Sequence, residues 1–245
     1  EAVDTVSRVV VDYEIYSTAI AEQDGLLNFP SDIYIFTDGI LELKPGIEIR
    51  LSPGKSIDIY GTLLSEGNST DKVKITSSST AWESIKFYPG SNETTMSNGE
   101  YIKGSRFLHT EISNGGAGSV PALDLSTFIL FENTTISNSQ STAIRSTVGA
   151  SLKYSTVTDA NRCLDVSPKL EIYHSTIVNC LSESIYFVNG ATTPCNLVIE
   201  SSTISNSNTY GTNVQCTASE NHTITIQNNF YSDNRYHLYI SMPYG

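Results

Sequence analysis

The sequence has few charged residues, and their signs are unbalanced. Charged residues make up 16% of the 245 positions, and 14 Lys and Arg stand against 26 Asp and Glu, for a formal net charge of −12. Because affinity for nucleic acid and for anionic membranes comes mainly from Lys and Arg, this charge argues against both partners. No apolar run approaches the roughly 20 residues of a membrane-spanning helix. We therefore expect no direct membrane insertion in this segment.

Cysteine is also scarce, and its spacing excludes the common metal motifs. The four cysteines at 163, 180, 195 and 216 form no C-x-x-C pair, and no His stands at zinc-ligand spacing beside them. We therefore expect neither a metal site nor a cofactor. An even count in a chain rich in Ser and Thr favours two disulfides and an extracellular location, as a secreted protein or the ectodomain of a membrane protein. Four sequons permit N-glycosylation, at Asn68, Asn92, Asn133 and Asn221.

The second half of the chain contains an internal repeat. Six tetrapeptides share an apolar or aromatic second residue and end in Asn or Asp, at intervals of 20–27 residues. They begin at Glu111, Thr135, Thr156, Thr176, Thr203 and Phe230. Five residues before each second position stands another apolar residue: Phe107, Phe131, Leu152, Ile172, Ile199 and Ile226. A third apolar position follows each Asn or Asp: Leu123, Ile144, Leu164, Ile185, Val214 and Leu238.

This pattern predicts an all-β fold made of stacked coils. Each repeat holds three short strands separated by polar turns, and the i, i+3, i+4 spacing of helices is absent. Three short strands cannot bury an apolar face alone, whereas stacked copies can, at about 4.8 Å per coil. We therefore predict a single-stranded, right-handed parallel β-helix with three strands per coil.

The Asn/Asp positions predict a ladder at one corner of the coil. Its members are Asn114, Asn138, Asp159, Asn179, Asn206 and Asp233. We expect these side chains to turn inward and to bond the backbone and the neighbouring side chain, so that buried polar groups are paired.

The first half has the same alternation of apolar and polar residues without the Asn column. Period-two strands recur from residue 33 onward, separated by Pro-Gly and Gly turns such as those at 45–46 and 53–54. We predict a β-helix domain over 33–245. Residues 1–32 are predicted to form an N-terminal cap or lead-in segment that covers the open end of the helix.

Four segments of the first half resemble a known repeat cassette. They span 39–49, 57–67, 73–77 and 82–85, from Gly39-Ile40-Leu41-Glu42-Leu43 to Trp82-Glu83-Ser84-Ile85. The sequence here is similar to extracellular β-helix repeat proteins, including the bark beetle (Anakonda) proteins of animal tricellular junctions and bacterial surface proteins. The β-helix resemblance covers about residues 33–240 and implies the wider pectin-lyase-like superfold. The scavenger-receptor cysteine-rich modules of the junction proteins are absent from this chain.

The register of the coils predicts the disulfides. Cys163 and Cys180 each follow an Asn/Asp corner on adjacent coils, and Cys195 and Cys216 flank the fifth coil on one side. We predict the pairs Cys163–Cys180 and Cys195–Cys216, each worth about 3 kcal/mol from the closed loop. Four free buried thiols are the alternative.

The catalytic motifs of pectin-lyase-like hydrolases are absent. Asn-Thr-Asp, Asp-Asp, Gly-His-Gly and Arg-Ile-Lys do not occur. One outward row contains Asp124, Arg145 and Asp165, and the two carboxylates would stand about 9.6 Å apart, at the upper limit for an inverting glycosidase. Because Arg145 lies between them, we favour a cross-strand charge stack and assign no catalytic residue.

The sequence therefore favours a non-enzymatic extracellular scaffold or adhesion domain that makes protein–protein contacts at the cell surface or at cell junctions. Its partner would be another protein or a second copy of the chain. A polysaccharide-binding or polysaccharide-degrading domain of the same fold is the alternative, with Asp124, Arg145 and Asp165 as its candidate catalytic residues. The acidic surface favours neutral or cationic ligands over acidic glycans.

Overall fold

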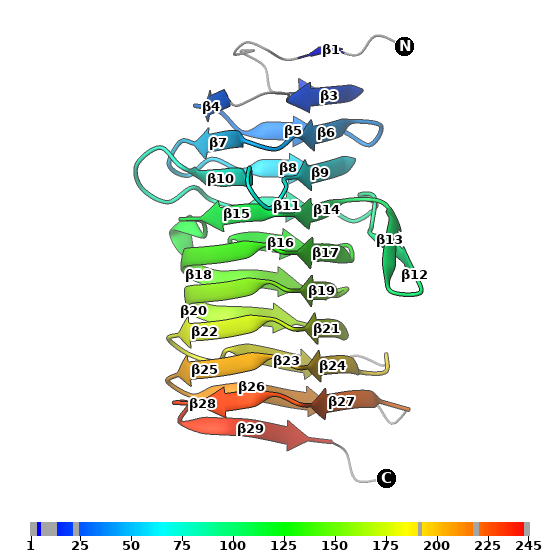
Figure 1. Ribbon diagram of the computed structural model, residues 1–245, viewed down its shortest axis with the longest axis vertical. Helices are drawn as coiled ribbons and strands as arrows, with labels where there is room; N and C mark the ends of the chain where they lie inside the picture. Colours follow the sequence, from blue (N-terminus) through cyan, green and yellow to red (C-terminus); the bar gives the residue numbers. More distant parts are fainter. Residues whose placement is uncertain (1–3, 6–13, 22–24, 191–192, 218–220, 243–245) are drawn as a thin grey trace.

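The chain forms a right-handed parallel β-helix of about nine turns (Figure 1). The computed structural model describes residues 4–5, 14–21, 25–190, 193–217 and 221–242. A 10-stranded parallel sheet forms one face of the coil, here called face A, and a 17-stranded parallel sheet wraps the other two, faces B and C. The predicted all-β class with three strands per coil is confirmed.

The strands repeat in the order A, B, C along the chain. Face A contains β1 (Asp4–Thr5), β3 (Thr18–Ala21), β6 (Ile40–Leu43), β9 (Thr62–Glu66), β14 (Arg106–Leu108), β17 (Ile129–Glu132), β19 (Ala150–Lys153), β21 (Lys169–Tyr173), β24 (Asn196–Glu200) and β27 (Thr223–Gln227). Face B contains β4 (Gly25–Phe29), β7 (Ile47–Leu51), β10 (Val73–Ser77), β15 (Thr110–Ser113), β22 (Thr176–Cys180), β25 (Thr203–Ser207) and β28 (Phe230–Ser232). Face C contains β2 (Glu14–Ile15), β5 (Ile33–Ile35), β8 (Ile57–Ile59), β11 (Ile85–Phe87), β16 (Leu123–Leu125), β23 (Ile185–Asn189), β26 (Tyr210–Cys216) and β29 (Tyr236–Ser241). The long strands β18 (Thr135–Ser146) and β20 (Thr156–Val166) bend through both B and C.

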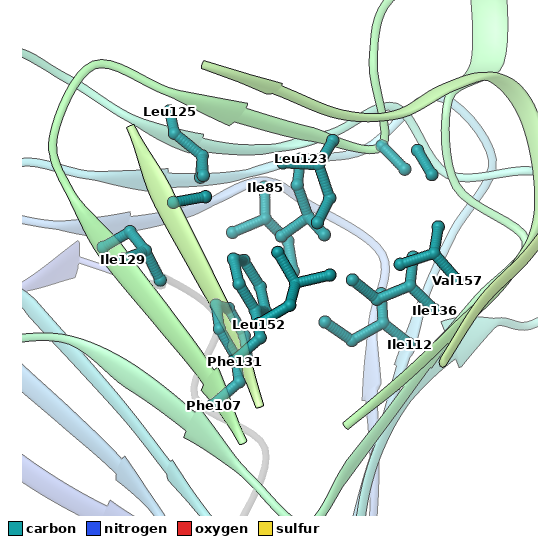
Figure 2. Close-up of a cluster of buried hydrophobic side chains, with 14 of the residues drawn as sticks. Ile85, Phe107, Ile112, Leu123, Leu125, Ile129, Phe131, Ile136, Leu152 and Val157 are labelled. Atoms are coloured by element: carbon teal, nitrogen blue, oxygen red, sulfur yellow. The ribbon is translucent and has the colours of Figure 1, made fainter. Parts of the chain in front are cut away.

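The predicted apolar columns fill the interior. Strand registers place Phe107, Phe131 and Leu152 over one another, and the first two rings stack with their centroids 5.1 Å apart. Figure 2 shows this column beside that of Ile112 and Ile136. These side chains are at most 1% exposed, so alternation along each strand separates a dry core from a polar surface.

One member of the third column was predicted wrongly. Thr212, not Val214, pairs with Ile185 on one side and Leu238 on the other, and Val214 belongs to the column of Phe187. The Thr212 hydroxyl lies 3.0 Å from the Tyr231 hydroxyl, so this polar group is satisfied inside the core.

The Asn/Asp residues stand in a single file, but they do not turn inward as predicted. All six have positive φ, between 52° and 60°, and Asn138, Asp159, Asn179 and Asn206 are exposed. Asn and Asp tolerate this left-handed conformation better than most other residues, which explains their recurrence. On the outside of the corner, the amide of Asn206 donates to Asn179 Oδ1 (2.7 Å) and that of Asn179 to Asp159 Oδ1 (3.1 Å).

The interior polar ladder is instead made of hydroxyls at the turn between faces A and B. The Thr134 N–H donates to Ser155 Oγ, the Ser155 N–H to Ser175 Oγ and the Ser175 N–H to Ser202 Oγ, each at 3.1 Å. Asn229 continues the series by accepting from the Ser202 N–H at 2.8 Å. This internal hydroxyl ladder pairs backbone donors that would otherwise be buried unsatisfied.

Parallel pairing extends into the first 32 residues. Strands β2, β3 and β4 pair with β5, β6 and β7, so residues 14–21 and 25–29 continue the same three faces. A capping role for 1–32 stays a prediction, because most of 1–13 lies outside the described residues.

Both predicted disulfides are present. Cys163 is bonded to Cys180 and Cys195 to Cys216, with Cα–Cα distances of 5.7 and 6.2 Å. The described residues contain one helical segment, the 3-10 turn η1 (Ala117–Ser119), and no helix with the length and hydropathy that spanning a bilayer requires. Disulfides persist in oxidising environments, so the pairs indicate such a compartment.

Candidate functional site

A β-hairpin stands off the coil and builds one wall of a groove. Strands β12 (Thr95–Ser97) and β13 (Glu100–Lys103) pair antiparallel and project beside β14 and β17 (Figure 1). Their turn is Asn98-Gly99, with φ of 51° and 82°. Two consecutive positive φ angles suit the tight turn that matches the twist of a hairpin.

The base of the hairpin depends on a glycine. Gly104 has φ +96°, and a Cβ there would lie 1.7 Å from the backbone oxygen of Glu93. The Thr94 hydroxyl donates to the backbone oxygen of Ser105, and the Ser105 N–H donates to that of Asn92 (3.0 Å). These contacts fix the hairpin where the chain leaves and re-enters face A.

The groove between hairpin and face A has a volume of about 990 Å³. Its floor comes from four adjacent strands, β14, β17, β19 and β21, so it extends along the helix axis for about 14 Å, or three strand spacings. The side chain of Lys153 reaches across the groove, and the Lys153 ammonium donates to the backbone oxygen of Gly99 at the hairpin tip. Aromatic, cationic and acidic side chains line it: Tyr101, Phe128, Tyr154, Tyr173, Arg106, Lys153, Lys169, Glu93, Glu100, Glu132 and Glu171.

Two of the three cations of the groove already form ion pairs. Arg106 pairs with Glu66 (2.6 Å) and lies 4.0 Å over the ring of Tyr101. Lys169 pairs with Glu171 (3.0 Å) and lies 4.3 Å over the ring of Phe128. Arg106 and Lys169 therefore each have a carboxylate and an aromatic face within reach, a combination that holds both side chains in place.

The groove is also lined by acidic residues without an ion pair and by tyrosines. Glu93, Glu100 and Glu132 have no ion-pair partner among the described residues. Burial raises the pKa of Tyr101, an effect that nearby Arg106 reduces. Burial also raises the pKa of Tyr173, with the charge of Glu171 adding to it. Both phenols are thus held neutral, as hydroxyls that can donate and accept.

The ring of Tyr154 is the most exposed aromatic of the groove. It is 58% exposed, and one face stacks on His174 of the next coil, with ring centroids 5.1 Å apart. Both residues have positive φ and lie at the same turn of successive coils.

The row of Asp124, Arg145 and Asp165 exists as predicted, since the three residues are paired in register across face C. Arg145 forms two hydrogen bonds to Asp124, at 3.1 and 2.6 Å, and this contact raises the pKa of Arg145. Asp165 is bonded by Arg162 (3.0 Å) rather than by Arg145. Both carboxylates therefore have an arginine partner, in accord with a structural stack.

The one group of possible metal ligands in the described residues does not fit a metal. It consists of Cys195, Cys216 and His222, but the two sulfurs form a disulfide and are not thiolates. Nδ1 of His222 accepts the Cys195 N–H at 3.1 Å. This donor set is thus already committed.

The four sequons differ in their surroundings. Asn68, Asn92 and Asn221 are exposed, whereas Asn133 is half-buried at a turn with φ of 50°. The amide of Asn92 donates to Thr62 Oγ1 at 2.7 Å. Use of any sequon stays a prediction.

The groove was not predicted from the sequence, although one signal for its hairpin wall is present there. Asn-Gly between short alternating segments is a strong hairpin signal, and Asn98-Gly99 is such a pair. The four strands of the floor were predicted, but the register of the coils does not predict that residues 95–103 fold back over them.

The chain matches no family model, no curated protein and no solved structure. Its similarity to β-helix repeat proteins is therefore a similarity of fold, and no match supports a pectin-lyase-like or tricellular-junction assignment.

Proposed function

We propose that this chain is a non-catalytic extracellular β-helix module that binds a segment of a neutral or amine-bearing polysaccharide in the hairpin groove. The observation that carries the proposal is the groove itself, a concave site of about 990 Å³ on a rigid sheet. Binding sites are typically concave and combine apolar surface with a few placed polar groups. The two disulfides support an extracellular location.

The shape of the groove supports an extended ligand. It runs along the helix axis, and its polar groups repeat once per coil because they belong to successive strands. A chain of sugar rings presents hydroxyls along its whole length. Glu132, Lys153 and Tyr173, which are paired in register on three adjacent strands, offer acceptors and donors in such a row.

The charges of the groove select among glycans. Four carboxylates line it against three cationic side chains, and two of those cations already form ion pairs. A uronic-acid polymer would bring further negative charge to a surface of net charge −12. Neutral sugars avoid this repulsion, and protonated amino sugars would gain from Glu93, Glu100 and Glu132.

Absence of catalysis is part of the proposal. Asp124 and Asp165, the candidate acid and base from the sequence, are each engaged by an arginine on face C. They also belong to a different face from the groove, whose floor is face A.

The test is calorimetric titration with cello-oligosaccharides, chitosan oligosaccharides and oligogalacturonates. We expect binding of the first two classes and weaker binding of the third. Tyr154→Ala should weaken binding about tenfold, equivalent to ~1.4 kcal/mol. Tyr16→Ala is the matched control, since Tyr16 is 60% exposed and stacks on Phe36 away from the groove.

Two outcomes contradict the proposal. Absence of heat with every glycan class, or an equal loss in both tyrosine variants, removes the groove as a binding site. New reducing ends during long incubation with the unmodified protein would mean that the module is an enzyme.

A scaffold or adhesion role through protein contacts is the second candidate. One observation favours it: Ile102 on the hairpin and Leu181 at a corner of the coil are apolar side chains that are more than half exposed.

A further inference from the structure

Aromatic side chains occupy the corner between faces C and A on four successive coils. The residue that directly follows each face C strand is Tyr16 after β2, Phe36 after β5, Tyr60 after β8 and Tyr88 after β11. These strands are paired in register along the coil axis (Figure 1), so the four residues form one column. Tyr60 stacks on Tyr88 with ring centroids 4.4 Å apart, and Tyr34 on face C lies 6.5 Å from the ring of Phe36. We call the rings of Tyr34, Phe36, Tyr60 and Tyr88 the aromatic edge.

The aromatic edge is accessible and has described coils on both sides of it. Tyr34 is 37% exposed, Tyr60 is 36% exposed, and Phe36 and Tyr88 are half-buried. Strand β2 pairs with β5 on one side and β16 pairs with β11 on the other, so the edge does not depend on where the coil begins or ends. None of its rings is among the described residues that line the hairpin groove. An inference from this edge is therefore independent of the proposed glycan site.

Carboxylates without an ion pair lie beside these rings. Asp58 is paired in register with Tyr34 and is 6% exposed. Its two oxygens accept from the Ser56 hydroxyl (2.7 Å) and from the Tyr88 hydroxyl (3.2 Å). Asp38 is exposed in the turn between β5 and β6. Within the described part of the chain, no cation lies at ion-pair distance from either carboxylate.

The two lysines of this region are paired with other acids. Lys55 Nζ lies 3.4 Å from the carboxylate of Asp32. Lys86 is paired in register with Asp58, but its ammonium lies 2.6 Å from Glu83. Two ion pairs are thus closed, and the charges of Asp58 and Asp38 remain for a ligand.

This negative charge acts on the phenols of the edge. The charge of Asp32, then burial and the charge of Asp58, raise the pKa of Tyr34. Burial, followed by the charge of Asp58, raises the pKa of Tyr88. A cation at this edge would meet both carboxylates and the negative faces of aromatic rings. The surface therefore complements a cationic ligand and opposes an anionic one.

We propose that the aromatic edge binds an arginine-bearing segment of a partner protein. The guanidinium group is planar, stacks on aromatic faces and donates to carboxylates, whereas an ammonium is a more strongly hydrated point charge. The three coils of the edge extend over about 10 Å, or two strand spacings, which is longer than one cationic group and suits a peptide segment. A second copy of the chain is disfavoured as the occupant, because each copy carries a net charge of −12.

Fluorescence anisotropy with a labelled hexa-arginine peptide tests the proposal, at a salt concentration of about 0.15 M that screens distant charges. We expect the peptide to bind and hexalysine to bind more weakly. Tyr60→Ala should raise the Kd of hexa-arginine about two- to fivefold, the loss expected for one exposed cation–π contact. Tyr60→Phe keeps the ring and should keep the wild-type Kd.

A second pair of variants separates a local carboxylate from the net charge. Asp58→Asn should raise the Kd about as much as Tyr60→Ala does. Asp159→Asn is the matched control, because it removes the same charge at a corner where Asn138 and Asn179 hold the equivalent positions on the adjacent coils. It should leave the Kd unchanged. Circular dichroism checks that each variant keeps the wild-type fold, and the Tyr60 pair tests the edge independently of the buried Asp58.

Several results overturn the inference. Absence of hexa-arginine binding does so, as does hexalysine that binds equally tightly. Equal effects of the two Asp→Asn variants would show that binding follows net charge alone, and equal effects of Tyr60→Ala and Tyr60→Phe would exclude the ring. Spermine that displaces the peptide at the same concentration would make a small polyamine the occupant. Self-association of the chain that Tyr60→Ala abolishes would make the occupant a second copy.

Discussion

Two serines on one coil allow a direct test of the internal hydroxyl ladder. Ser151 and Ser155 are both buried, at 0% and 3% exposure. The Ser155 hydroxyl accepts the Thr134 N–H (3.1 Å) and donates to the backbone oxygen of Lys153 (2.9 Å). The Ser151 hydroxyl has no hydrogen-bond partner among the described residues. The same substitution at these two positions therefore removes very different interactions.

Ser155→Ala leaves the Thr134 N–H buried without an acceptor. An unsatisfied buried donor costs about 1–3 kcal/mol of the free energy of unfolding. Since 1 kcal/mol shifts Tm by about 2–4 °C in a domain of this size, we expect a decrease of about 2–12 °C. Ser151→Ala removes a hydroxyl that is already unpaired, so its Tm should stay the same or rise.

Thermal and urea denaturation followed by circular dichroism measures both effects. Ser155→Thr is the rescue variant, because Thr134 occupies the same ladder one coil earlier and shows that a threonine fits there. The reasoning fails if Ser155→Ala matches the wild type, or if both alanine variants lose stability equally. Equal losses would mean that the volume of the hydroxyl group matters and that its hydrogen bonding does not.

Three further predictions concern the glycine at the base of the hairpin, the half-buried phenol of Tyr88 and the corner residue Asn179. Gly104→Ala should abolish glycan binding in calorimetry and lower Tm, because the new Cβ must displace the backbone of Glu93 and alanine is strained at a φ of +96°; a bound glycan would contradict this. Burial raises the pKa of Tyr88 above its ordinary value of about 10, and the charge of Asp58 and its hydrogen bond to the phenol raise it further. The protonated phenol therefore contributes stability that is present below pH ~10 and is lost at higher pH. Tyr88→Phe should flatten the fall in Tm above that pH. Asn179→Ala should lower the free energy of unfolding, measured by urea denaturation, by about 1–2 kcal/mol, because φ is 58° there and alanine disfavours this conformation. Asn179→Gly should lower it less, because glycine adopts positive φ readily, and equal losses would exclude a conformational cause.

Much of the fold follows from the sequence because stacking repeats the same environment in every coil. The positions of Phe107, Phe131 and Leu152 could be aligned from spacing alone, and the same register gave both disulfides. The register failed at Thr212, where an apolar residue was expected. A hydroxyl fits there because Tyr231 supplies a partner from the next coil, which the sequence of one strand does not reveal.

The groove could not be predicted in the same way because it is not part of the repeat. Its floor residues, such as Glu132 and Lys153, are outward positions on strands, where sequence patterns leave side-chain identity free. Its wall exists only because residues 95–103 form a local hairpin whose tip contacts Lys153 two coils later. A turn signal predicts the hairpin, but its direction depends on Gly104 and the contacts at its base.

The corners between faces A and B and between faces B and C show that backbone conformation, rather than side-chain burial, selects the repeated residues. Left-handed residues occur at both, five positions apart, as at Tyr154 and Asp159 or His174 and Asn179. A non-glycine residue in this conformation costs free energy at every coil. Stacking offsets that cost through contacts between successive corners, by amide hydrogen bonds between Asn179 and Asp159 and by ring stacking between His174 and Tyr154. The Asn/Asp ladder therefore lies on the outside of the coil, where side chains from adjacent coils contact each other. The interior hydrogen bonds are made by the serine that directly follows the left-handed residue, as Ser155 follows Tyr154.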